Sequence, residues 1–284
     1  MAPLPVRSEI RSAHPVVRVV YRPAMITDLP RLVDALPAGM LPPGRLVTPE
    51  DGGPPPYWLS DAPVEPALWA RLRSQHPESG LWPLVLSGLS LEENRPWVDG
   101  EVRPARMSSP DRHDPAELLA GWWDRGQSDD DDPEAAEATA PFGVDWPGPA
   151  ESGEPAGPAE EFADEYVDFL ADGKARLGLV PAARGADALV VTGWTGPTNF
   201  TNDSGKIAAV VRSWEERFGA RVVGLGFDTL HLSVAAPPTS PEHALWVAAE
   251  HFACCPDNIW QGSGTLTAYA EQILGVHSWS FWWD

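Results

Sequence analysis

The sequence predicts an α+β protein whose C-terminal part forms a ferredoxin-like plait, the split βαβ arrangement, with one extra helix. Three observations support this prediction. Apolar residues recur at helical spacing in several C-terminal segments, they alternate in shorter ones, and capping residues or glycines separate the two kinds. The predicted order from residue 188 onward is therefore strand, helix, two strands, two helices and a final strand.

Residues 1–127 are predicted to form an N-terminal mixed α/β domain. Its clearest helix places Leu68, Trp69 and Leu72 on one side, and another begins at Asp114 with Pro115 in the first turn. Strands are predicted at 16–21 and 81–89, and helices at 26–36, 65–75 and 114–125.

Residues 128–158 are predicted to be a disordered acidic linker rich in Pro, Gly and Ala. The chain has a net charge of −21, and residues 128–172 contribute most of it because they hold 15 acidic residues and no Lys or Arg. Such a composition offers little apolar surface to bury. The C-terminal domain, residues 159–284, is then predicted to open with a packed helix that carries Phe162, Tyr166, Phe169 and Leu170.

The next predicted elements are a strand at 188–194 and a long amphipathic helix. Asp203 or Ser204 caps this helix, and Gly219 ends it. Apolar residues recur along it at i, i+3, i+4, i+7 and i+11, as one buried stripe requires. The stripe consists of Ile207, Val210, Val211, Trp214 and Phe218.

Alternating residues then predict two strands, 221–227 and 229–235, which turn at Asp228. Ser240 caps a second helix that runs to Cys255, and a third helix spans 264–275. The last predicted strand, 276–283, is aromatic on both sides, with Trp279, Phe281 and Trp283 on one and Trp282 on the other.

Composition argues against several classes of protein. Apolar runs fall short of the roughly 20 residues that a membrane helix needs, and the N-terminus lacks the apolar core of a secretory signal. Cys254 and Cys255 are adjacent, which excludes a disulfide framework. We therefore expect a cytoplasmic protein. Basic residues form no large patch, so we expect neither nucleic-acid nor membrane binding, and no motif indicates a cofactor.

Both cysteines lie in HFACCPDNIWQG, residues 251–262, where Pro256 ends the second helix. His251 and Cys255 could share a metal, but further ligands at suitable spacing are missing, so no metal site is predicted. A helix C-terminus raises a thiol pKa, which disfavours a nucleophilic cysteine. We predict that the segment ends a buried helix and that its polar residues brace the turn, with Glu250 and Cys254 facing solvent.

A candidate ligand site lies where the hairpin turn and the end of this helix are expected to meet. His231 is on the strand side away from Leu230, and Gly224 and Gly226 leave room beside it for a ligand or a covering side chain. No catalytic residue is assigned. The candidate binding residues are Asp228, His231, His251, Asp257, Asn258, Trp260 and Gln261.

Three segments, GFDTLHLSVAAPP, AAEHFACCPDNIWQG and the terminal WSFWWD, together resemble the bacterial domain-of-unknown-function family 4253 over roughly the last 110 residues. The N-terminal LPPGRLVT and GLWPLVL also resemble an extension that such proteins carry. The resemblance implies an α+β domain in the bacterial cytosol and implies no activity. Cys254 stands where the family pattern has an aromatic residue, so the double cysteine looks incidental.

These features favour a non-enzymatic interaction module whose partner is another protein, with an immunity or antitoxin-like role as one form of it. The 14 Trp residues suit a binding surface. The alternative is an enzyme or small-ligand-binding protein with its site near His231, Asp228 and the CPDNIWQG turn, where a histidine and carboxylates could serve acid–base chemistry. The sequence leaves the oligomeric state open.

Overall fold

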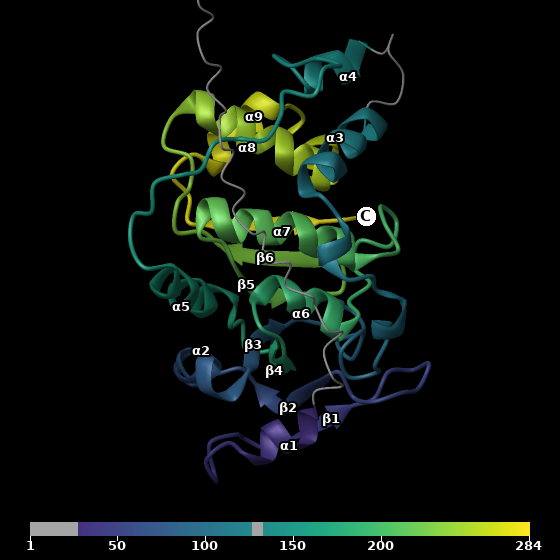
Figure 1. The fold of residues 1–284 in the computed structure, drawn as a ribbon, viewed down its shortest axis with the longest axis vertical. Helices are drawn as coiled ribbons and strands as arrows, with labels where there is room; N and C mark the ends of the chain where they lie inside the picture. Colours follow the sequence, from purple (N-terminus) through teal and green to yellow (C-terminus); the bar gives the residue numbers. More distant parts are fainter. Residues whose placement is uncertain (1–27, 127–132) are drawn as a thin grey trace, which may run out of the picture.

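The computed structural model describes residues 28–126 and 133–284. Its strands form one mixed sheet in the order β1-β2-β4-β3-β5-β6-β7, so an α+β fold is confirmed (Figure 1). The strands are β1 (Gly44–Val47), β2 (Tyr57–Pro63), β3 (Leu81–Leu86), β4 (Arg176–Pro181), β5 (Arg221–Leu225), β6 (Thr229–Ser233) and β7 (Ser278–Trp282).

Helices cover both faces of the sheet, and each face has its own cluster of buried apolar residues. One face packs against α1, α2 and α5. The other packs against α6 and α7, with α3, α8 and α9 gathered toward the β7 end (Figure 1). The helices are α1 (Leu29–Asp34), α2 (Pro66–Ser79), α3 (Pro115–Gly126), α4 (Pro133–Ala138), α5 (Ala159–Leu170), α6 (Gly185–Thr192), α7 (Ser204–Phe218), α8 (Pro241–Cys254) and α9 (Leu266–Ile273), with the short turns η1 (Pro104–Arg106), η2 (Pro110–Arg112) and η3 (Asn258–Ser263).

Strand β3 joins the two parts of the chain. It pairs antiparallel with β4 and parallel with β5, where Val85 lies opposite Gly224 and Leu86 opposite Leu225. One continuous sheet therefore contains strands from both predicted domains, residues 1–127 and 159–284. The ferredoxin-like plait is not confirmed, because the strand between β4 and β5 comes from the N-terminal part and β4 and β5 are antiparallel to each other.

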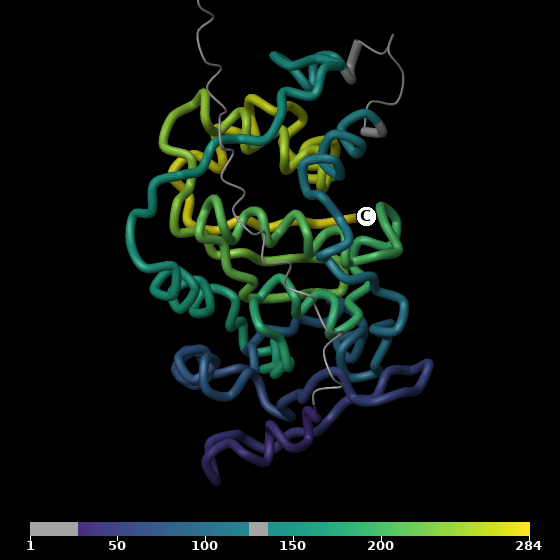
Figure 2. Tube along the Cα trace, viewed as in Figure 1, coloured from purple at the N-terminus to yellow at the C-terminus, as the bar shows by residue number. Residues whose placement is uncertain are grey.

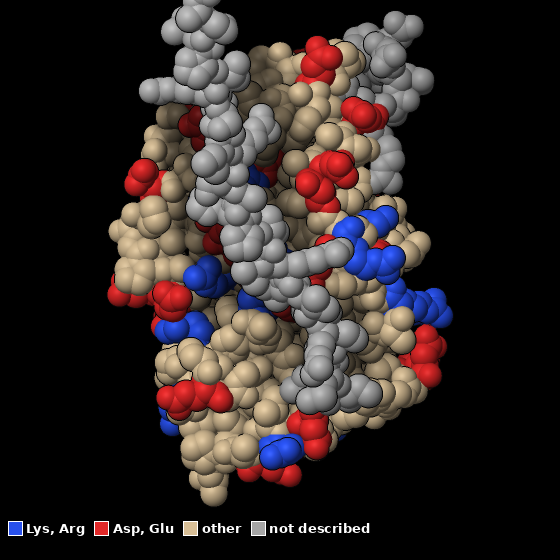
Figure 3. All heavy atoms as spheres, in the orientation of Figure 1, with Lys and Arg blue, Asp and Glu red and all other residues tan. Residues whose placement is uncertain are grey.

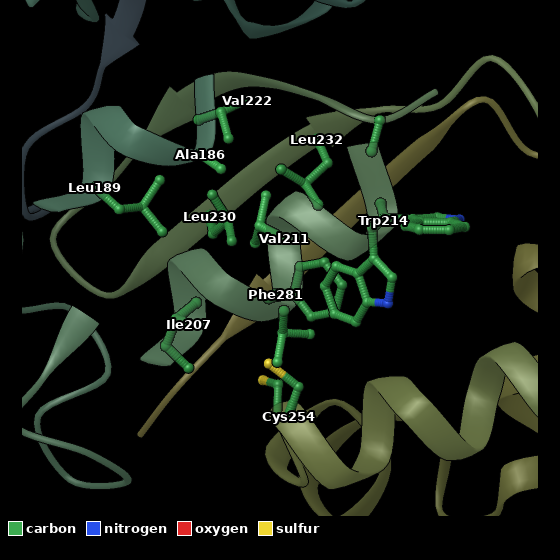
Figure 4. Packing of buried hydrophobic residues seen from close by; sticks show 14 of the residues in the cluster. Ala186, Leu189, Ile207, Val211, Trp214, Val222, Leu230, Leu232, Cys254 and Phe281 are labelled. Carbon is green, nitrogen blue, oxygen red and sulfur yellow. The ribbon is translucent and has the colours of Figure 1, made fainter. Parts of the chain in front are cut away.

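Helix α7 confirms the predicted caps and stripe. Asp203 accepts a hydrogen bond from the Gly205 N–H at 3.0 Å, and Gly219 ends the helix with a φ of +59°, a conformation that glycine adopts easily. The five predicted stripe residues are all buried. Figure 4 shows Val211 and Trp214 of this helix packed toward Leu230, Leu232 and Phe281 of the sheet.

Other predictions need correction. Residues 188–194 are not a strand, because helix α6 occupies Gly185–Thr192 and Gly193 caps it with a φ of +71°. A short apolar run does not distinguish a buried strand from a buried helix, and α6 is buried on several sides. Strands β1, β2 and β4 were not predicted, and the strand predicted at 16–21 lies outside the described residues.

Part of the predicted linker packs against the rest of the chain. Residues 139–158, here called the strap, run from the top of the molecule down to α5 (Figure 2). Trp146 packs against Trp123 with ring centroids 5.5 Å apart, and the Ala156 N–H donates to the Ala235 carbonyl at 2.9 Å. The strap thus gains the apolar burial and backbone hydrogen bonds that its overall composition does not suggest.

Candidate functional site

The CPDNIWQG turn forms η3, a π-helical turn that lies along the outer edge of β7. Nδ2 of Asn258 donates to the Ser280 carbonyl at 2.8 Å, and its Oδ1 accepts from the Trp282 N–H at 3.2 Å. The side-chain amide thereby takes the place of a neighbouring strand along this stretch of edge. This geometry agrees with the bracing role that the sequence favours for the turn.

His251 lies inside the core, surrounded by aromatic rings. Its ring centroid is 4.4 Å from that of Trp279 and 4.8 Å from that of Phe281. Nδ1 is 3.1 Å from the hydroxyl of Tyr269, which also accepts from Nδ2 of Asn258 at 3.1 Å. Burial, helped by the positive charge of Arg217, lowers the pKa of His251 to about 3. The imidazole is therefore neutral at physiological pH and serves as part of the core.

The two cysteines are buried at the end of α8. Burial raises the pKa of both thiols well above the usual range, so neither is a thiolate at neutral pH. The Cys255 thiol donates to the Trp282 carbonyl at 3.0 Å, which adds another link between the helix end and β7. Within residues 28–126 and 133–284, no group of three or more His, Cys, Asp or Glu side chains is placed to hold a metal ion.

His231 lies on the opposite face of the sheet, beneath α5. Its Nδ1 is 3.1 Å from the Tyr166 hydroxyl and 3.3 Å from the Ser280 hydroxyl. A Cβ built on Gly224, its cross-strand neighbour, would lie 3.3 Å from a methyl group of Leu170. The space predicted beside His231 is therefore occupied by α5. Burial lowers the pKa of His231 to about 4.

The remaining candidates lie at the exposed end of β7. Asp257 accepts from Nε2 of Gln261 at 3.0 Å and from the Asp284 N–H at 3.1 Å. Asp228 accepts from Nε1 of Trp282 at 3.2 Å. Trp260 is 38% exposed and packs its ring against Phe252, with centroids 5.8 Å apart.

The seven candidates therefore occupy different surroundings. The turn residues and Asp228 meet around the end of β7, His251 is enclosed in the core, and His231 lies beneath α5 on the other face of the sheet. Ser280 contacts both sides, since its carbonyl binds Asn258 and its hydroxyl lies near His231. These contacts form a connected structural network, in which His231 lies beneath α5 and Asp257 lies in the exposed turn.

A surface that the sequence did not indicate lies between α5 and β7. A hollow of about 330 Å³ is lined by Phe162, Glu165, Tyr166, Phe169, His277 and Ser278. The Phe162 ring stacks on His277 with centroids 4.0 Å apart, whereas Phe169 is 80% exposed. Phe169 was expected to pack inward with the rest of its helix, but Ala163 and Val167 form the buried side.

Acidic residues line the same side of α5. Glu161, Glu165 and Asp168 are exposed and follow one another at helical spacing, next to the stripe of Phe162, Tyr166 and Phe169. None of the three forms an ion pair with a Lys or Arg that the structure describes, unlike Glu160 and Asp164 on the same helix. We call these three carboxylates, the three aromatic residues and His277 the acidic aromatic surface.

Basic side chains elsewhere do not form a continuous track on the described part of the face in Figure 3, where Lys and Arg are interspersed with Asp and Glu. Many of them are paired, such as Arg73 with Asp164 at 2.7 Å and Arg212 with Asp187 at 2.6 Å. Among the helices that the structure describes, none has the length and apolar composition to span a bilayer.

Comparison with known proteins gives one match. Neither the curated proteins nor the solved structures include a match to this chain. The model of the family described as domain of unknown function DUF4253 matches residues 176–284, which run from β4 to the end of β7 and include η3 and the Asp228 turn. The resemblance of the C-terminal segments to the DUF4253 family is thereby confirmed over residues 176–284.

Proposed function

We propose that the protein is a non-enzymatic interaction module whose acidic aromatic surface binds a basic, amphipathic segment of another protein. The observation that carries this proposal is the exposure of Phe169, at 80%, beside a hollow that other aromatic residues line. Aromatic side chains in or beside a concave surface are the usual anchors of a protein interface.

The charge around the hollow defines the partner. Glu161, Glu165 and Asp168 lack a basic partner among the described residues, so a segment with Lys or Arg next to apolar residues would complement them. Such a segment would place an apolar side chain against Phe162 and Phe169 and basic side chains along α5. The net charge of −21 would also speed the encounter with a basic partner.

An immunity or antitoxin-like role is a narrower form of this proposal, in which the partner is a basic effector protein. The acidity of the chain and its helical docking surface support it only by analogy. The enzyme alternative gains no support from the geometry, because His231 is covered by α5 and Asp257 lies in a separate exposed turn.

Site-specific photocrosslinking in the native host tests the proposal. The substitution Phe169→p-benzoylphenylalanine places the crosslinker in the hollow, and the same substitution at Leu91, which is 95% exposed on another surface, is the matched control. We expect position 169 alone to give a specific protein adduct, and the crosslinked peptide to be rich in Lys or Arg and in apolar residues.

A second variant separates charge from shape. The double substitution Glu165→Lys and Asp168→Lys should abolish the adduct while leaving the thermal unfolding midpoint within about 2 °C, because both side chains are exposed. Equal adducts at positions 169 and 91, no adduct at 169, or an adduct that survives the charge reversal would overturn the proposal.

A further inference from the structure

A second and larger hollow, of about 960 Å³, lies at the end of the sheet where the parallel strands β3 and β5 finish. In sheets with parallel strands, the carboxyl ends of those strands are the usual position of a ligand site. Five chain segments form the walls, and they come from both the N-terminal part and the DUF4253 segment: residues 50–51, 95–107, 195–202, 227–228 and 283–284.

Hydrogen bonds between neighbouring segments hold these walls in place. The Glu50 N–H donates to the Gly100 carbonyl at 2.7 Å, and the Arg103 N–H donates to the Gly193 carbonyl at 2.8 Å. Nε1 of Trp194 donates to the Gly226 carbonyl at 2.9 Å. The hollow is therefore a preformed feature of the fold, as most small-molecule sites are.

One glycine is needed for this arrangement. Gly100 has a φ of +74°, and a Cβ at this position would lie 2.3 Å from the Thr48 carbonyl oxygen. Only glycine allows the two loops to approach so closely without strain.

The charges in the hollow are partly matched within the protein. Arg95 pairs with Glu101 at 2.7 Å, and Arg106 lies 3.5 Å from Asp51. The guanidinium of Arg103 has no ion pair with any residue in the described ranges. The carboxylates of Glu50, Asp228 and Asp284 likewise have no Lys or Arg partner there.

Two of the unmatched acids, Asp228 and Asp284, come from adjoining segments. The Trp283 N–H donates to the Asp228 carbonyl at 3.2 Å, which holds the turn before β6 beside the end of β7, and Asp228 and Asp284 both line the hollow from there. Arg103 lies on the wall formed by the loop that contacts Gly193, the residue before Trp194 and Thr195. Val102 and Trp283 are almost fully buried and supply an apolar floor.

We propose that this hollow binds a basic amino acid, either free or at the carboxyl end of a short peptide. The ligand's α-carboxylate pairs with Arg103, its cationic groups pair with Asp228 and Asp284, and its aliphatic stem rests on the apolar floor. The amide side chains of Asn199 and Asn202, which also line the hollow, are placed to bind the remaining polar groups. This site shares no residue with the acidic aromatic surface, so it goes beyond the interaction function proposed above.

Isothermal titration calorimetry of the full chain tests the site with three probes: L-arginine, the dipeptide Arg-Arg, and agmatine, which is arginine without its carboxylate. We expect L-arginine or the dipeptide to bind, and the tighter of the two identifies the natural form. Arg103→Ala should weaken both by about tenfold or more and leave agmatine binding unchanged, because only the carboxylate contact is lost.

Asp284→Asn should weaken all three probes, and Arg45→Ala, which removes an exposed ion pair with Asp61 elsewhere, should weaken none. Absence of binding at millimolar concentration, or equal losses for arginine and agmatine in Arg103→Ala, would overturn the proposal. Either result would leave the crosslinking experiment at Phe169 unaffected, since the two surfaces are separate.

Discussion

Arg217 and Glu250 form a bidentate, largely buried ion pair that holds the strap against α7 and α8. Nη2 of Arg217 lies 2.6 Å from Oε2 of Glu250, and Nη1 lies 2.7 Å from Oε1. The same carboxylate accepts from the Ala150 N–H at 2.6 Å and from Nε1 of Trp214 at 2.7 Å. Glu250 was expected to face solvent, and it is buried because the strap covers that side of α8.

Glu250→Ala should lower the free energy of unfolding by about 3–5 kcal/mol, since it leaves Arg217 largely buried without a partner. Urea unfolding measures the loss. Glu216→Ala, which breaks an exposed pair with Arg184, is the control and should cost less than about 1 kcal/mol. Limited proteolysis should then cut Glu250→Ala within the strap before the wild type. A loss below about 1 kcal/mol in Glu250→Ala would contradict the role assigned to the pair.

Asn258→Ala should destabilise the protein by about 1–3 kcal/mol, because the Ser280 carbonyl and the Trp282 N–H both lose their partner. It also uncovers part of the β7 edge, so the variant should self-associate more strongly, as measured by analytical ultracentrifugation. Gln261→Ala, on the same turn but bonded only to exposed carboxylates, is the control. If both variants behave alike, the edge of β7 is not what Asn258 protects.

Residue spacing alone predicted the elements whose apolar residues recur regularly over a long stretch of sequence. The stripe of α7 and its caps follow directly from residue spacing, and so do α8, α9 and β7. The same reasoning failed for α6, which is short and apolar on most sides, so its period is not visible.

Contacts between distant segments explain the other failures. The pairing of Val85 with Gly224 joins residues far apart in the chain and has no local signature. Glu250 and Cys254 face outward on a helical wheel, yet both are buried. The strap covers Glu250, which accepts a hydrogen bond from the Ala150 N–H, and Cys254 lies near Phe281 (Figure 4). For the site, residue type identified a polar network around β7 but could not show that α5 would cover His231.

Glu215→Gln should change how stability depends on pH. Burial raises the pKa of Glu215 from 4.5 to about 7, although the Ala186 N–H and the charges of Arg184 and Arg221 act in the opposite direction. The folded state therefore binds more protons than the unfolded state between pH 4.5 and about 7, and this contribution to stability is lost as the pH rises through that range. Relative to Glu215→Gln, the wild type should lose up to about 3 kcal/mol from pH 4.5 to 8 in urea unfolding. A constant difference between the two proteins would refute this assignment.

His231→Gln should have the opposite effect. The folded pKa of about 4 lies below the ordinary value of 6.5, so the folded state binds fewer protons between these values. The contribution of His231 is complete above pH 6.5 and is lost as the pH falls toward 4. We expect the wild type to lose up to about 3 kcal/mol more than the variant over this interval in chemical denaturation. If the stabilities of the wild type and His231→Gln fall equally with pH, burial beneath α5 does not lower the pKa of His231.

Cys254 and Cys255 should not react with a thiol reagent such as DTNB in the native protein, because both thiols are buried and their pKa values are raised. Two equivalents should react rapidly in denaturant. The reaction rate under native conditions should follow the unfolding equilibrium and increase in Glu250→Ala. Rapid modification of the native wild type would mean that the end of α8 is accessible.

The position of β3 has a consequence for every shorter version of this protein. A fragment that begins at residue 176 would carry β4 and β5 with their facing edges bare, since the strand that bridges them is made from residues 81–86. Any chain that shares the matched segment and this sheet but lacks such an extension has to fill the gap with another strand of its own or with one lent by a second molecule.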